Sequence, residues 1–274
     1  VAVNNDAITR EHDGTTYYVE GLSSGLPTIL AIEADRMANL GDNVDQRELD
    51  LQRNVVKNEM RQNVLDQAGA AGRNAFWSAL FPKSHPYSRA VIGSIADLDD
   101  ASLDEVRGFF NTYYVPNNAI IALVSDFDVE AAKALVADTF GRVPRGKDVA
   151  RPAIPEPAPT RARIEVSDRV ATPSVVIGFS GPAATAEENG DLSIASDILG
   201  NDAFGLLRTR LVSEKGIASA VGSYWTPGLL GGRFEISATA NEGVSAETLE
   251  KELRAAFDEF LAAPIDAGDV ARAK

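Results

Sequence analysis

The chain of 274 residues contains no cysteine. This absence excludes disulfide bonds, thiolate nucleophiles and cysteine-ligated zinc sites, and it is compatible with an oxidising compartment such as a periplasm as well as with the cytosol. Histidine is almost absent too, because only His12 and His85 occur and they lie far apart in sequence. No HExxH or HxxEH pair is therefore present to bind a metal from one helix. We interpret both histidines as structural or turn residues.

The sequence is also short of positive charge and of long apolar runs. It has 26 Lys and Arg against 40 Asp and Glu, a net charge of −14. This balance argues against nucleic acid and anionic membrane surfaces as partners, because both require clustered cations. No run approaches the roughly 18 apolar residues of a membrane span, and no basic segment followed by an apolar one opens the chain. Neither end resembles a natural terminus, so we expect a fragment or processed form of a longer protein.

A proline-rich segment divides the sequence into two parts. ARPAIPEPAPT (150–160) holds four prolines, which favour an extended, semi-rigid conformation typical of a linker. The hydrophobic content of 45% is ordinary for a globular protein, and the length indicates one large or two medium domains. The sequence therefore predicts two folded units joined near residues 148–160.

Helix and strand patterns alternate in both parts. Before the linker, the patterns predict a strand at 15–22, a buried strand at 117–127, and helices at 26–40, 45–68, 71–81, 102–114 and 128–141. After it, they predict strands at 161–168, 174–181, 219–225 and 232–240, and helices at 188–200, 204–216 and 245–263. Such mixing indicates an α+β protein with antiparallel-rich sheets and helices packed on one face of each.

The predicted helix at 45–68 carries a carboxylate at an unexpected position. With a period of 3.6 residues, one side of this helix holds Leu49, Gln52, Val56, Glu59 and Asn63. A carboxylate among apolar neighbours requires a cation or a metal as partner. Periodicity alone favours a salt bridge from Glu59 to Arg or Lys and leaves a metal ligand as the alternative.

Several segments together resemble the insulinase/pitrilysin family of zinc metallopeptidases. In the order of that family, they are EADRMANL (33–40), LDLQRNVVKNEMRQN (49–63), ALFPKSHPY (79–87), IGSIADL (92–98) and FFNTYYVPNNAIIALVSDFD (109–128). DILGNDAFGLLRTRLVSEKGIASAV (197–221) resembles, more loosely, the start of the family's second homologous domain. The resemblance implies two homologous-type units of the mitochondrial-processing-peptidase-like metallohydrolase fold, both incomplete.

The resemblance also implies a division of the chain and a zinc site. Residues 1–147 would form the C-terminal part of a first, zinc-ligand-bearing domain, residues 148–160 the linker, and residues 161–274 the N-terminal part of a second, non-catalytic domain. The family's VVxxE pattern falls on Glu59, so the resemblance implies that this residue is the third zinc ligand. The HxxEH segment, with the other two ligands and the general-base Glu, would precede Val1.

The resemblance implies a substrate site as well, and two departures from the family pattern affect it. Substrate is expected to bind as an added β-strand inside a closed chamber formed by two bilobed halves. The substrate-side edge strand of the family, Asn-Ala-aromatic-Thr, falls here on Asp6, Ala7, Ile8 and Thr9. Gln52 stands where the family often has a second acidic residue. Its amide can still hydrogen-bond to a zinc ligand, but it does not add the negative charge that an acidic residue would place beside the zinc site.

Two hypotheses of function follow from these observations. In the first, the chain is part of a zinc endopeptidase that hydrolyses peptides or small unfolded proteins, and the chain alone is inactive because one carboxylate does not make a zinc site. Its partners would be the HxxEH segment and a second bilobed half or partner subunit. In the alternative, the parent is a non-catalytic scaffold or partner subunit of the same family that binds peptides or a catalytic subunit. We expect a periplasmic or secreted location, with the cytoplasm as the alternative.

Overall fold

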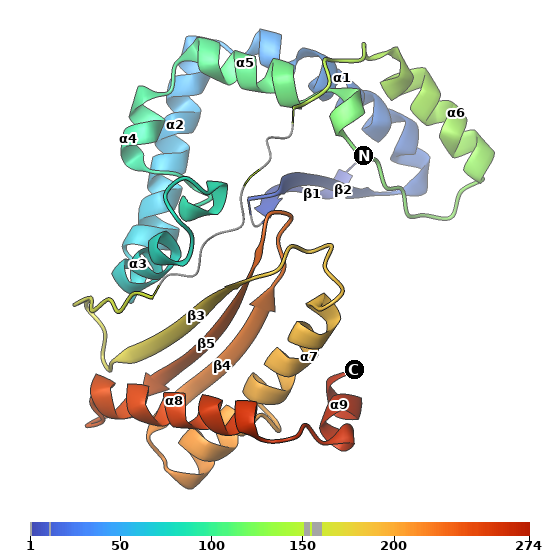
Figure 1. Cartoon of the computed structure of the whole chain (residues 1–274). Coiled ribbons are helices and arrows are strands. Elements are labelled where there is room, and N and C mark those ends of the chain that lie inside the picture. Colours follow the sequence, from blue (N-terminus) through green and yellow to red (C-terminus); the bar gives the residue numbers. More distant parts are fainter. Residues whose placement is uncertain (1, 11, 151–153, 155–160) are drawn as a thin grey trace. The chain divides into compact units, whose positions relative to one another are not determined.

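The structure, a computed structural model, describes residues 2–10, 12–150, 154 and 161–274 (Figure 1). Most of the predicted linker lies outside these residues. The chain divides into two compact units, one comprising Val1–Arg10, Gly14–Gln62 and Val91–Ala153, and the other Glu11–Asp13, Asn63–Ala90 and Ile154–Lys274. The division of the parent protein at residues 148–160 stays a prediction.

The first unit is mainly helical and carries one hairpin. Its elements are β1 (Ala2–Arg10), β2 (Gly14–Gly21), α1 (Leu26–Asn43), α2 (Gln46–Met60), α4 (Ile95–Asp100), α5 (Leu103–Tyr113) and α6 (Val129–Thr139). Strands β1 and β2 form a two-stranded antiparallel sheet, while α1 packs against α5 and α6, and α2 packs against α4. The capping box predicted for α5 is present, since Ser102 and Glu105 exchange hydrogen bonds.

The second unit is a three-stranded antiparallel sheet with helices. Its elements are α3 (Ala70–Leu80), β3 (Ser174–Gly181), α7 (Asn189–Gly200), β4 (Ala218–Thr226), β5 (Gly232–Ala240), α8 (Ala246–Ala262) and α9 (Ala267–Ala273). The strand order is β3-β5-β4. Along β5 every second residue is buried, as expected for a central strand with one face on a core.

The core of the second unit lies between this sheet and helices α7 and α8 (Figure 1). Its fully buried members include Leu199 of α7, Ile236 of β5, and Leu249 and Leu253 of α8. Helix α3 instead meets β3 at Gly178, where an added Cβ would lie 2.2 Å from the ring of Phe76. The predicted α+β class with antiparallel sheets is confirmed.

Two predicted strands are wrong in this structure. Residues 117–127 and 161–168 contain no strand, although their composition is apolar and β-branched. The side chains of Ile120 and Val124 are each 98% exposed rather than buried. A strand needs a neighbour to pair its backbone groups, and no described strand pairs with either segment. Composition alone therefore could not predict a strand here.

Two predicted helices also differ from the structure. The helix predicted over 45–68 ends at Met60 and continues as a π-helical turn, Arg61–Leu65. The helix predicted over 204–216 contains a π-helical segment at Arg208–Glu214. Within the described residues, no helix is both long enough and apolar enough to cross a membrane.

Helix α8 offers a direct test of the core of the second unit. Leu253 is completely buried, so Leu253→Ala should lower the free energy of unfolding by about 2–5 kcal/mol, because it leaves a cavity. Leu261 lies on the same helix but is 66% exposed, and Leu261→Ala should change stability by no more than about 0.5 kcal/mol. Urea unfolding followed by circular dichroism measures both, and equal losses would contradict the assigned core.

Candidate functional site

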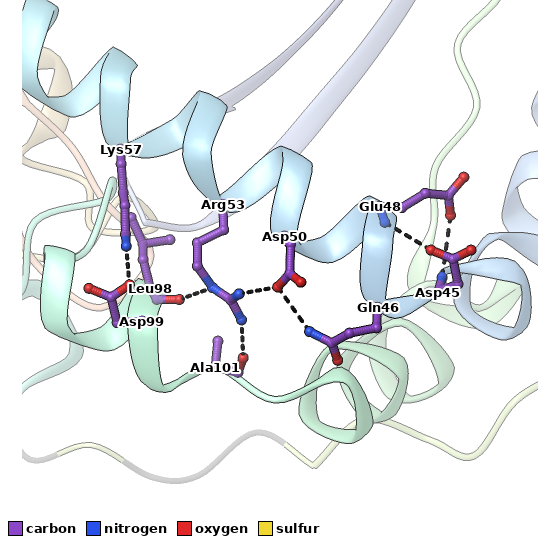
Figure 2. Close-up of polar contacts among 9 residues, drawn as sticks. All are labelled: Asp45, Gln46, Glu48, Asp50, Arg53, Lys57, Leu98, Asp99 and Ala101. Atoms are coloured by element: carbon purple, nitrogen blue, oxygen red, sulfur yellow. Dashed lines mark hydrogen bonds and ion pairs between the residues drawn. The ribbon is translucent and has the colours of Figure 1, made fainter.

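Helix α2 begins at a well-defined N-terminus. The Asp45 carboxylate accepts a hydrogen bond from the Glu48 N–H at 2.8 Å, and the Asp45 N–H donates to the Glu48 carboxylate at 3.3 Å (Figure 2). This reciprocal pair is a capping box, which satisfies two N–H groups that the first turn leaves without helical partners. The start of the helix that carries Glu59 is therefore fixed by local sequence.

Two cations orient α2 against the segment that contains α4. Arg53 donates from Nε to the Leu98 carbonyl at 2.6 Å and from Nη2 to the Ala101 carbonyl at 2.7 Å (Figure 2). One turn later, Lys57 forms an ion pair with Asp99 (Figure 2). Both cationic side chains are largely buried, because their aliphatic stems cover apolar surface while their charged ends find partners.

The packed side of α2 differs from the predicted apolar side. Met60 is buried and Arg53 and Lys57 are partly buried, whereas Glu59 and Gln52 are both exposed. Glu59 and Gln52, which periodicity places beside Leu49 and Val56, therefore lie on the exposed side of the helix. The aliphatic stems of Arg and Lys side chains can pack like apolar residues. The side of α2 that packs against the protein is therefore not the side that its apolar residues alone indicate.

Glu59 has no cation at helical spacing. The positions three and four residues away are Val55, Val56, Gln62 and Asn63. Lys57 is paired with Asp99, and Arg61 donates to the Asn58 side chain at 3.0 Å. Among the described residues no ion pair involves Glu59, so the predicted salt bridge to Arg or Lys is not formed there.

Apolar side chains accompany Glu59 on the exposed side of α2. Leu51 is 60% exposed and Val55 is 51% exposed, and together with Glu59 they follow one line along the helix at four-residue intervals. These two aliphatic side chains form a small apolar strip beside the Glu59 carboxylate. Glu59 thus combines an available carboxylate with apolar neighbours on a rigid helix.

The described residues do not form a metal site by themselves. No group of three His, Cys, Asp or Glu side chains converges anywhere in the described part of the chain, and zinc sites need at least three protein ligands. The residues present therefore do not fit a complete zinc site. Glu59 can supply one ligand to a site whose other ligands come from elsewhere.

Both histidines have structural roles, as predicted. His85 is buried and stacks on Phe81 with ring centroids 4.7 Å apart. Its Nδ1 accepts from the Tyr87 N–H at 3.1 Å, and its Nε2 faces the Leu230 carbonyl at 3.3 Å. His12 lies in the turn after β1, where its Nε2 donates to a backbone carbonyl at 2.5 Å. Both ring nitrogens of His85 therefore face protein partners, and one nitrogen of His12 does.

The predicted substrate edge strand lies within β1. Asp6, Ala7, Ile8 and Thr9 are all exposed, and they pair with Tyr18, Tyr17, Thr16 and Thr15 of β2. Strand β1 has β2 as its only neighbour among the described strands. Its second edge therefore presents backbone donors and acceptors that can pair with an added strand.

Tyr17 anchors the hairpin from β2. Its hydroxyl shares a 2.8 Å hydrogen bond with the Tyr114 hydroxyl, and the Arg36 guanidinium lies 3.8 Å from the centre of its ring. Burial, followed by the bond to Tyr114, raises the pKa of Tyr17 to about 12, because both favour the neutral phenol. The hairpin is therefore anchored through β2. The edge of β1 that faces away from β2 has no neighbour among the described strands.

Comparisons with known proteins place this fold in a family. The profile of the peptidase M16 inactive domain matches residues 100–274. The chain belongs to this family. It is 27% identical over 252 residues to a protein named zinc protease PqqE from Helicobacter pylori, covering 90% of this chain and 56% of the relative. The chain thus spans about half the length of the curated relatives it matches.

Solved structures agree with the assignment at the level of the fold. A protease from Helicobacter pylori superposes with a TM-score of 0.83 and 24% identity, over 98% of this chain and 65% of the other. A peptidase M16 inactive domain from Pseudomonas fluorescens superposes with a TM-score of 0.85 and 20% identity, again over 98% of this chain and 65% of the other. The recognition of the insulinase/pitrilysin-type family from sequence is confirmed.

Sequence reasoning missed the residues that position the site. Arg53, Lys57 and Met60 recur at intervals of four and three residues, which is a helical face if long cationic stems count as apolar. That pattern could have predicted the packed side of α2. No comparable signal marks Tyr17, whose partners Arg36 and Tyr114 are distant in sequence.

Replacing Tyr17 by Phe tests the anchoring of the hairpin. The folded pKa of Tyr17 lies above the ordinary value of 10.0, so its stabilising effect is complete below pH 10 and is lost as pH rises towards about 12. Tyr17→Phe should lower the free energy of unfolding near pH 8 by about 1 kcal/mol. It should also flatten the fall in stability above pH 10, because Phe does not titrate. Urea unfolding at several pH values measures both effects.

Tyr224→Phe is the matched control, since Tyr224 is 60% exposed. It should change stability by no more than about 0.5 kcal/mol at any pH. An alkaline stability profile that is identical in wild type and Tyr17→Phe would contradict the anchoring role.

Proposed function

We propose that this chain is part of a zinc-dependent endopeptidase that acts on peptides or small unfolded proteins, with Glu59 as one zinc ligand. The observation that carries the proposal is the exposed Glu59 carboxylate, which has no cationic partner among the described residues and lies in line with Leu51 and Val55. The relative named zinc protease PqqE supports the chemistry. A Glu held in a surface salt bridge has a cationic partner, and Glu59 has none among the described residues, either at helical spacing or from another element.

In this proposal the remaining parts of the zinc site would belong to an HxxEH segment of the parent protein. That segment would supply two histidine ligands and the general-base Glu, and Glu59 would complete the protein ligands. Gln52 lies seven residues before Glu59 on the same exposed side, so its amide can hydrogen-bond to the ligand shell. Leu51 and Val55 provide the apolar contact that holds the HxxEH segment against α2.

The β1 edge provides the substrate site in this proposal. An extended peptide adds to the free edge of β1 along Asp6–Thr9 through backbone hydrogen bonds, which bind without requiring one particular sequence. A second bilobed half or partner subunit closes the chamber around the peptide. A periplasmic or secreted location completes the proposal and is compatible with a cysteine-free, acidic chain.

A non-catalytic scaffold of the same family is the second candidate. The match to a domain described as inactive favours it, because that match covers residues 100–274 and does not include Glu59. The residues encoded immediately upstream of Val1 discriminate between the two. An HxxEH motif there supports the peptidase, and its absence supports the scaffold.

The isolated 274-residue chain should show neither peptidase activity nor stoichiometric zinc. A single carboxylate does not bind zinc tightly, because structural and catalytic sites use three or four protein ligands. Elemental analysis after dialysis against zinc, together with cleavage of a fluorogenic peptide, measures both properties. One equivalent of zinc with proteolysis by this chain alone would refute the proposal that ligands are supplied from outside it.

In the full-length parent protein, Glu59→Gln should abolish peptidase activity and weaken zinc binding. Changes to residues that only contact zinc ligands cost about 10–100-fold in metal affinity, so loss of a ligand should cost roughly 100-fold or more. Gln52→Ala should cost about 10-fold for the same reason. Zinc titration with a competing chelator measures the affinities.

Glu48→Gln on the same helix is the control for Glu59→Gln. Glutamine also serves in capping boxes, so α2 should remain folded and activity should stay within about twofold. Full zinc occupancy and activity in Glu59→Gln would exclude Glu59 as a ligand.

A further inference from the structure

Asp6 occupies a distinctive position on the free edge of β1. Its Oδ1 accepts a hydrogen bond from the backbone N–H of Ala7, the next residue, at 2.8 Å. The Ala7 donor is therefore engaged by a carboxylate of its own strand. Asp6 thus satisfies from within the chain a donor that a neighbouring strand would otherwise satisfy.

The Asp6 carboxylate also lacks a charged partner. No ion pair joins Asp6 to any side chain that the structure describes, and the residue is exposed. Arg36, which contacts β2 through Tyr17, is itself paired with Glu33 at 3.1 Å. The edge therefore carries a negative charge directly beside a backbone position that pairs with an incoming strand.

We infer that Asp6 makes this edge selective for extended peptides that carry a Lys or Arg side chain. This inference rests on the proposed function, because it assumes that β1 accepts a strand. A carbonyl of the added strand replaces Asp6 as the acceptor for the Ala7 N–H. The released carboxylate then pairs with a cationic side chain of the peptide, whereas an acidic side chain at that position is repelled.

The expected selectivity is modest and depends on salt. Exposed ion pairs contribute little in water, so a Lys peptide should bind about 3-fold more tightly than its Gln counterpart and about 10-fold more tightly than its Glu counterpart. The ratios should shrink when the ionic strength is raised to about 1 M, because the Debye length then falls to about 3 Å.

The test measures binding to the 274-residue chain by nuclear magnetic resonance. Three acetylated and amidated peptides, Thr-Val-X-Val-Thr with X as Lys, Gln or Glu, are titrated while the Ala7 and Thr9 amide signals are followed. Wild type should give the order Lys, Gln, Glu from tightest to weakest. Asp6→Asn keeps a hydrogen-bond acceptor for the Ala7 N–H but removes the charge, so its Lys-to-Glu ratio should fall to about 2 or less.

Glu130→Gln is the matched control, because it makes the same change in net charge at an exposed residue of α6. Its Lys-to-Glu ratio should equal that of wild type. Equal affinities of wild type for all three peptides, or an unchanged ratio in Asp6→Asn, would overturn the inference while leaving strand addition intact. Absence of any Ala7 shift with every peptide would overturn strand addition at β1 and this inference together.

Discussion

The bonds from Arg53 to the carbonyls of Leu98 and Ala101 set the orientation of α2, and the arrangement of the candidate site depends on that orientation. A largely buried guanidinium that donates to two carbonyls resists rotation of the helix, because rotation would break both bonds and leave the carbonyls without these donors, although Asp50 on the same helix would still pair with the charge. Lys57 adds a second contact one turn later through Asp99. With this side of α2 fixed on the protein, Glu59 is directed to the exposed side.

Local signals in the sequence predicted most of the elements correctly. The capping box at Ser102 and Glu105 marks the start of α5, and the alternating pattern of residues 232–240 marks the central strand β5. These signals work because they act over a few residues and need no distant partner. The apolar run at 119–124 failed for the opposite reason, since a strand exists only where another strand pairs with it.

The candidate site was predictable in part. Ordered matches to a family indicated Glu59, Gln52 and the strand at Asp6–Thr9, and their functional roles stay predictions. Periodicity grouped the exposed Glu59 and Gln52 with the half-buried Leu49 and Val56, because it counted only apolar residues and not the stems of Arg53 and Lys57. Single-sequence reasoning could not find the bond between Asp6 and Ala7, which depends on how an unpaired edge satisfies its own backbone.

Asp6 and Glu59 share one electrostatic property, although their surroundings differ. Each is an exposed carboxylate without an ion-pair partner among the described side chains of an already acidic chain. Glu59 lies on a rigid helix beside Leu51 and Val55, where a covering segment would remove water and strengthen its attraction for a cation. Asp6 lies on an open strand edge, where water keeps such an attraction weak. Under the proposed function, the same charge would therefore serve tight coordination at α2 and loose, reversible selection of peptides at β1.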